Sequence, residues 1–266
     1  MKESYYEIDK QYEDLSKAKL YWEIGKGLQE VDYLHTSKKL DDLINEHLAG
    51  KKDYLEVEKE IKEYHSKYGN STKREDEADI VATRIAKLLN GTDFRLTKQE
   101  LLRTHKYIFD GLFDNDFELR GCEGKIRTVN IEKSEDVLDG KSVVYTDYHN
   151  IEEYLDYDLE EERNRIRNEE VDNVTHLSKF VSNIWNTHPF REGNTRTTAV
   201  FIVRYLRANG VNIINNLFKE NSLYFRNALV LSSDNQSETP ATNEYIESYF
   251  NKLLKDPNAK LKEIIK

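Results

Sequence analysis

Apolar residues recur at helical spacing along most of the chain. Steps of three and four residues place side chains on one face of a helix, so each such stripe predicts an amphipathic helix. We predict a helical stretch over residues 3–34 and two more helices around the stripes at 40–48 and 54–64. Later helices are predicted over 79–89, from Thr97 to 109, and over 150–167, 171–187, 195–208, 221–233 and 241–255.

The polar segment 68–72, Tyr-Gly-Asn-Ser-Thr, interrupts this pattern with residues that favour turns. We therefore predict a boundary there, with a helical N-terminal extension over 1–70 and a main domain over 71–266. Only 3 prolines and 11 glycines occur in the 266 residues. Both residue types break helices, so their scarcity favours long helices over many tight turns.

The segment 121–148 departs from helical spacing. Three glycines punctuate it, and two short runs rich in β-branched residues lie at 126–131 and 143–145. Two such runs about a dozen residues apart predict a β-hairpin with a long loop. The fold class predicted from the pattern is all-α, with one β-hairpin and a helical N-terminal extension.

Composition limits the functional classes. Asp and Glu number 50 against 40 Lys and Arg, which gives a net charge of −10 and argues against a general nucleic-acid binder. No stretch approaches the ~20 apolar residues needed to cross a bilayer. Cys122 is the single cysteine, so an internal disulfide and a Cys-rich zinc site are excluded. We expect a cytoplasmic protein that binds neither nucleic acid nor membrane.

One polar stretch, residues 185–198, carries the candidate chemistry. It links two apolar helical segments and opens at the N-terminus of the second, where backbone N–H groups and the helix dipole favour an anion. Gly193 permits a turn that exposes backbone N–H groups, and Arg196 adds a cation in the first turn. His188 supplies a titratable base, and Glu192 supplies a hard oxygen ligand for Mg²⁺. Together these groups suit phosphoryl or nucleotidyl transfer.

The sequence HPFREGNTRT within this stretch resembles the signature of the Fic family, H-x-F-x-[DE]-G-N-G-R-x-x-R. The resemblance extends over about residues 75–255, where EGKIRTVNI followed by KSVVYTDY resembles the flap hairpin of that family. It implies a compact bundle of helices with one hairpin. The matching positions are His188, Phe190, Glu192, Gly193, Asn194 and Arg196.

The resemblance also implies an activity, the transfer of AMP from ATP to a Ser, Thr or Tyr hydroxyl of a target protein or of the chain itself. The target is expected to bind as an added strand at the flap, about residues 125–148. His188 is then the general base, and Glu192 holds Mg²⁺ on the phosphates. The nucleotide-binding residues implied are Gly193, Asn194, Thr195 and Arg196.

Two positions depart from the signature. Thr195 stands where the second glycine is expected, which is costly if the backbone there needs a positive φ, although its hydroxyl could cap the following helix. Ala199 stands where the final arginine is expected. That arginine pairs in the family with a glutamate in a [ST]-x-x-x-E-[GN] pattern, which the chain also lacks. We therefore expect no inhibitory switch of that Glu–Arg type.

Two other functions stay open. The same scaffold could transfer another nucleotidyl or phosphoryl group, or remove AMP. A non-catalytic nucleotide-binding module of the toxin–antitoxin type is the second, and the intact His188 argues against it.

Overall fold

Helices account for all the regular structure found in residues 15–68, 74–211, 213, 216–236 and 241–264, which are the residues that the computed structural model describes. No strand occurs in these ranges, so the prediction of an all-α protein is confirmed there. The α-helices are α1 (Ala18–Gly27), α2 (Lys38–Leu48), α3 (Tyr54–Tyr68), α4 (Glu75–Asn90), α5 (Lys98–Phe109), α6 (Ile151–Arg165), α7 (Val174–Thr187), α8 (Asn194–Ala208), α9 (Leu217–Glu220), α10 (Ser222–Ser233) and α11 (Glu244–Leu254). Short 3₁₀ helices are η1 (Leu28–Asp32), η3 (Asp136–Leu138) and η4 (Tyr148–Asn150).

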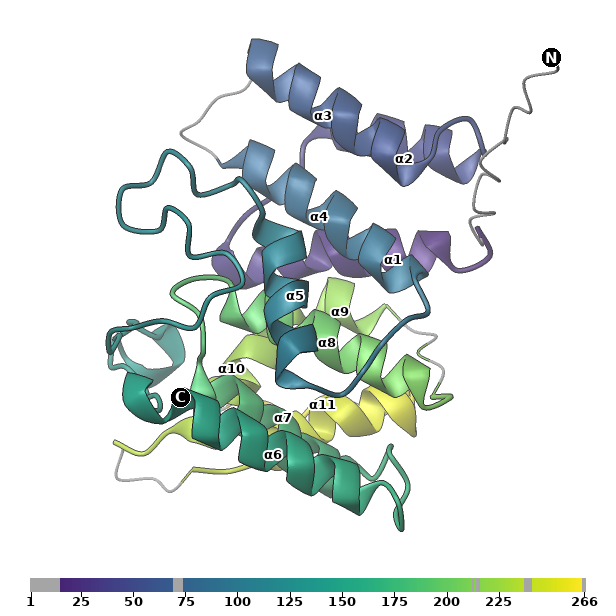
Figure 1. The fold of residues 1–266 in the computed structure, drawn as a ribbon. Helices are drawn as coiled ribbons and strands as arrows, with labels where there is room; N and C mark the ends of the chain where they lie inside the picture. Colours follow the sequence, from purple (N-terminus) through teal and green to yellow (C-terminus); the bar gives the residue numbers. More distant parts are fainter. Residues whose placement is uncertain (1–14, 69–73, 212, 214–215, 237–240, 265–266) are drawn as a thin grey trace, which may run out of the picture.

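Helix α8 is the centre of the molecule. Every residue from its start to Leu206 is buried, and it packs against α5, α7, α4 and η1. Helix α7 in turn contacts α6, α10 and α11, whereas α4 contacts α1 and α3 (Figure 1). Helix α8 therefore lies between these two groups of helices.

The N-terminal helices share the main hydrophobic core. Trp22, Leu28 and Leu43 are buried in the same cluster as the residues of α8 and α11. Helix α1 also passes very close to its neighbours, because a Cβ on Gly25 would lie 2.5 Å from the carbonyl oxygen of Ala82. Residues 69–72 of the expected boundary lie outside the described residues, and so do the apolar positions before 15. One core thus extends across the expected boundary.

Local signals place several helix ends correctly. Helix α5 begins after Thr97, whose hydroxyl accepts a hydrogen bond from the N–H of Glu100 at 3.2 Å. The predicted helical stretch 3–34 is not one continuous α-helix in its described part. That part forms α1 and then η1, which is followed by Tyr33 with φ 56°. The predicted helix at 221–233 begins one residue later as α10, preceded by the short α9.

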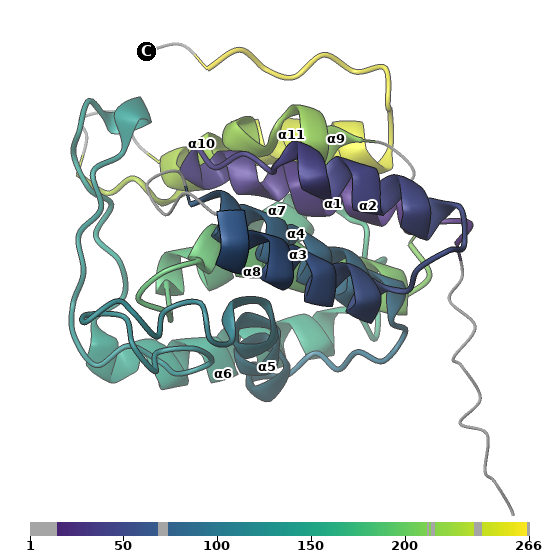
Figure 2. The same cartoon turned by 90° about the horizontal axis from the view of Figure 1, so that it is seen from above.

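The predicted β-hairpin is not found among the described residues. Residues 125–148 run out and back as a double arm without strands, closed by η3 at the tip (Figure 2). Backbone groups near the two ends pair with the last turn of α7 and with the loop that follows it, instead of with each other. Arg127 N–H donates to the carbonyl of Pro189 at 2.8 Å, and Thr146 N–H donates to that of Asn186 at 3.3 Å. These two N–H groups are therefore not available to a ladder between the arms.

Candidate active site

The loop between α7 and α8 has a fixed shape. His188 ends α7 with φ 46°, and Gly193 precedes α8 with φ 73°. A Cβ on Gly193 would lie 2.4 Å from the ring of Phe109, so both the backbone conformation and the space require glycine. The side-chain amide of Asn194 closes the loop by bonding to the backbone N–H and C=O of Phe190, at 2.9 and 2.8 Å.

His188 is held as a neutral imidazole. Its ring stacks on Tyr145 with 3.9 Å between centroids and meets the Trp185 ring edge-on. Nδ1 lies 3.1 Å from the carbonyl oxygen of Trp185, so Nδ1 donates the hydrogen bond and Nε2 carries the lone pair. Burial lowers the pKa of His188 well below its usual value, and the positive charge of Lys133 lowers it further.

Five of the six site residues predicted from the sequence line one cavity of about 290 Å³. His188, Glu192, Gly193, Asn194 and Thr195 all contribute to its wall. A second cavity of about 310 Å³ adjoins it, and Asp32, Lys133 and Glu192 belong to the lining of both. Arg196 lines neither cavity and is fully buried.

Thr195 does not have the conformation that would penalise a β-branched residue. It is the second residue of α8 and has a negative φ. The prediction that its hydroxyl caps the helix is wrong, because the N-cap is Gly193. The hydroxyl instead accepts a hydrogen bond from the indole N–H of Trp185 at 2.9 Å, which joins α7 to the start of α8.

Glu192 could hold one cation beside phosphate groups. Its carboxylate accepts a hydrogen bond from the N–H of Gly193 at 3.0 Å and lies 3.7 Å from Nη2 of Arg196. The side chain is 26% exposed. No group of three or more His, Cys, Asp or Glu in the described residues could hold a metal. One carboxylate does fit Mg²⁺, which takes most of its ligands from phosphates and water.

Arg196 is surrounded by carboxylates that the sequence did not reveal. Its Nε lies 2.9 Å from Asp32, and its Nη1 lies 3.0 Å from Glu77 and 3.3 Å from the amide oxygen of Gln29. These partners come from η1 and α4, more than a hundred residues earlier in the chain. No local signal could have found them. Ala199, one turn further along α8, is also fully buried.

Arg127 is a second residue that sequence reasoning missed. It is 2% exposed, and its Nε donates to the carbonyl of His188 at 2.8 Å. Nη1 donates to the carbonyl of Val129 at 2.7 Å, and Nη2 donates to that of Thr146. One side chain thus joins both arms of the segment 125–148 to the residue predicted as the base.

His105 also links the loop between α7 and α8 to the residues around the start of the segment 125–148. Its Nε2 donates to the carbonyl of Glu192 at 3.0 Å, and its Nδ1 accepts from the N–H of Gly124 at 2.8 Å. The ring stacks on Phe190 with 3.8 Å between centroids. Burial lowers the pKa of His105 to about 3, so this histidine is neutral and structural.

One comparison with known proteins found a match. Residues 95–206 match the sequence model of the Fic/DOC family, a range that contains α5, α6, α7, most of α8 and the loop that carries His188. Members of this family are commonly transferases and bind nucleotides. A search of curated proteins found no match. None of the described helices is long and apolar enough to span a membrane. In residues 95–206 the chain is therefore similar to the Fic/DOC family.

Proposed function

We propose that the chain transfers AMP from ATP to a Ser, Thr or Tyr hydroxyl of a target protein or of itself. The observation that carries this proposal is the position of His188. A neutral imidazole, oriented by the Trp185 carbonyl, lies in the wall of a cavity that the start of α8 also lines. A base next to a helix N-terminus suits a reaction in which a hydroxyl attacks a phosphate.

In the proposed reaction, Nε2 of His188 accepts the proton of the target hydroxyl. The hydroxyl oxygen forms a bond to the α-phosphorus of ATP, and the bond from that phosphorus to the bridging oxygen of the β-phosphate breaks. Pyrophosphate leaves, and AMP stays on the target. The Gly193 turn and the first residues of α8, Asn194 and Thr195, would hold the phosphate by backbone N–H groups.

Glu192 would hold Mg²⁺ beside the phosphates, and Arg196 would offset phosphate charge. When bound, Mg²⁺ would neutralise part of the charge on the leaving group. For this role the Glu192 carboxylate must turn away from the N–H of Gly193 and from Arg196. Its partial exposure is compatible with that movement.

The target would bind along the segment 125–148 as an added strand, and we place the activity in the cytoplasm. Val144 supports the proposed strand position. It is 53% exposed, and its N–H and C=O both bond to the side-chain amide of Asn235, at 3.2 and 3.3 Å. An amide that pairs with both backbone groups of one residue imitates a neighbouring strand, which an extended peptide could replace.

Mass spectrometry tests the proposed reaction. The purified chain is incubated with Mg²⁺ and each nucleoside triphosphate, with and without a protein extract. Addition of the mass of AMP from ATP is expected. Another added mass would assign another transfer, and tight nucleotide binding without any added mass would favour a non-catalytic module.

A further inference from the structure

Two aromatic rings enclose the imidazole of His188. Tyr145 lies against one face, with 3.9 Å between the ring centroids and 26° between the ring planes. The indole of Trp185 meets the imidazole edge-on, with 5.0 Å between centroids and 89° between planes. All three residues are buried. A rotation of the imidazole about its bond to Cβ would therefore tilt it into the ring of Tyr145.

The hydrogen bonds of His188 fix its backbone more firmly than its ring. Its N–H and its Nδ1 donate to the same carbonyl, that of Trp185, at 3.0 and 3.1 Å. Arg127 donates to the carbonyl of His188. The imidazole has no other hydrogen bond within the described ranges. Because one hydrogen bond tolerates a broad range of angles, the plane of the imidazole depends on the ring that stacks on it.

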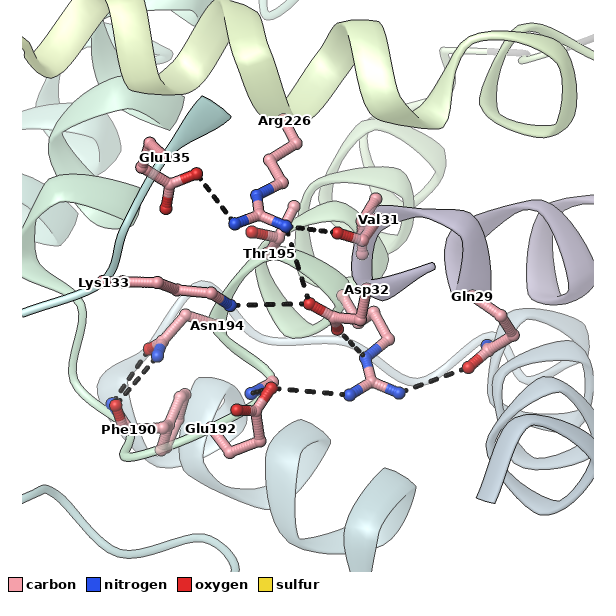
Figure 3. A network of polar contacts seen from close by, with 12 residues as sticks. Gln29, Val31, Asp32, Lys133, Glu135, Phe190, Glu192, Asn194, Thr195 and Arg226 are labelled. Carbon is pink, nitrogen blue, oxygen red and sulfur yellow. Dashed lines mark hydrogen bonds and ion pairs between the residues drawn. The ribbon is translucent and has the colours of Figure 1, made fainter. Parts of the chain in front are cut away.

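The two enclosing rings belong to different parts of the chain. Trp185 is in the last turn of α7, so local helix geometry places it beside the histidine. Tyr145 lies in the segment 125–148, and tertiary contacts place its ring. Its hydroxyl lies 3.5 Å from Oε1 of Glu135, whose other carboxylate oxygen pairs with Arg226 of α10 at 2.7 Å (Figure 3).

Tyr145 also follows directly after the residue proposed to pair with a target strand. Val143 is 1% exposed, Val144 is 53% exposed and Tyr145 is 7% exposed, so consecutive side chains alternate between the interior and solvent. The N–H of Thr146 donates to the carbonyl of Asn186, which ties this stretch to the end of α7. The stretch thus exposes Val144 to solvent and places Tyr145 against the imidazole.

We propose that Tyr145 is a positioning residue for His188, because its stacked ring fixes the plane of the imidazole and so directs Nε2 toward the target hydroxyl. This inference rests on the proposed function for the identity of the reaction. It gives the segment 125–148 a second role, since the segment that would bind the target also orients the base. Tyr145 acts only through His188 and touches neither the nucleotide nor the group transferred.

Nuclear magnetic resonance of the imidazole nitrogens in the full chain tests the orientation without any transfer reaction. The His188 signals are assigned by their loss in His188→Gln. At neutral pH the wild type should show Nδ1 protonated and Nε2 unprotonated, as the bond to the Trp185 carbonyl requires. Tyr145→Leu retains an apolar side chain without a ring and should populate the form protonated at Nε2. Tyr145→Phe retains the stacked ring and should resemble the wild type.

Tyr148→Leu is the matched control for these spectra. Tyr148 lies in the same segment but packs against another histidine, the exposed His149, with 3.8 Å between centroids. Its replacement should leave the His188 signals unchanged. Thermal unfolding checks that each variant folds. Tyr145→Met, which also lacks a planar ring and adapts to irregular space, takes the place of Tyr145→Leu if that chain does not fold.

The transfer reaction gives a second readout. Tyr145→Leu should lower kcat about tenfold or more, because a misdirected base loses part of the ~10²–10⁴-fold that general-base catalysis contributes. KM for ATP should change little, since Tyr145 does not line the cavity that His188 and Gly193 share. Tyr145→Phe should keep kcat near the wild-type value.

The outcomes separate this proposal from the proposed function. If a folded Tyr145→Leu chain keeps only the form protonated at Nδ1, the proposal is overturned even where AMP transfer is observed. If Tyr145→Phe changes the spectrum as much as Tyr145→Leu, the hydroxyl acts and not the ring, and the proposal is also overturned. If the spectra follow the expected order and the wild-type chain transfers no AMP, Tyr145 still orients His188 and the proposed reaction fails.

Discussion

At the scale of single residues, the decisive group is His188. Replacement of His188 by alanine should abolish transfer while ATP still binds, because the ring acts on the target hydroxyl and not on the phosphates. A general base contributes typically ~10²–10⁴-fold in rate. Transfer rates and ATP titrations should be measured on His188→Ala and on His176→Ala, whose side chain is 47% exposed. Transfer by the His188 variant near the wild-type rate would show that this histidine is not the base.

Glu192 gives a second test at this scale. Glu192→Ala should weaken the binding of ATP in the presence of Mg²⁺ and should change binding little without it, because Mg²⁺ takes one or two protein carboxylates beside phosphates. Titration of ATP with and without Mg²⁺ measures the difference. Glu118→Ala is a suitable control, since Glu118 is an exposed carboxylate that lines the same cavity. An unchanged metal dependence would mean that Glu192 only pairs with Arg196.

Buried histidines predict how stability depends on pH. In the folded chain the pKa of His105 is lowered to about 3, and that of His188 is also lowered. In the unfolded chain both histidines have a pKa near 6.5, so below that pH the unfolded chain binds more protons than the folded chain. The contribution of these two neutral histidines to the free energy of unfolding is therefore fully present above about pH 6.5. This contribution should fall by roughly 1 kcal/mol per pH unit for each histidine as the pH decreases toward its pKa in the folded chain. Urea unfolding of wild type and His105→Asn between pH 7 and pH 4 measures this, and equal slopes would contradict it.

At the scale of elements, the side chain of Arg127 connects the two arms of the segment 125–148, which no strand ladder joins. Arg127 donates to the carbonyls of His188, Val129 and Thr146, and the shorter glutamine can keep at most one of these bonds. Arg127→Gln should therefore destabilise the segment 125–148 by about 3–6 kcal/mol, since hydrogen bonds to charged groups contribute about 1.5–3 kcal/mol each. Hydrogen exchange of this segment should accelerate and transfer to a target should drop. Lys125→Gln, at an exposed position, is the control. Unchanged exchange in Arg127→Gln would mean that other contacts hold the arms.

At the scale of the whole molecule, the N-terminal helices complete the core. Trp22 is 1% exposed in the cluster that also contains α8, so deletion of residues 1–65 should give a product without cooperative thermal unfolding. Trp22→Ala should cost about 3–5 kcal/mol. Leu55→Ala, at a position 59% exposed, should stay within about 0.5 kcal/mol of wild type. A truncated chain that unfolds cooperatively and is more active would show that these helices only cover the site.

The sequence by itself determined what depends on neighbours along the chain. Apolar spacing predicted the helices, Thr97 marked a helix start, and the stretch around His188 and Gly193 indicated an anion site at a helix N-terminus and the family. These features follow from local hydrogen bonding, from steric limits on φ and from one-sided burial. Glycine at 193 is such a case, because its left-handed turn is a local requirement.

Only the tertiary structure decided which groups meet. Asp32 and Glu77 reach Arg196, and Arg226 reaches Asp32, because η1 and α4 pack against α8 and α10 packs against η1. Periodicity says which face of each helix is buried but not which face of another helix it meets. The hairpin prediction failed for the same reason. The β-branched runs are present in the sequence, but two nearby N–H groups, those of Arg127 and Thr146, donate to carbonyls at the end of α7 and in the loop after it. Which acceptor a donor meets there depends on tertiary packing.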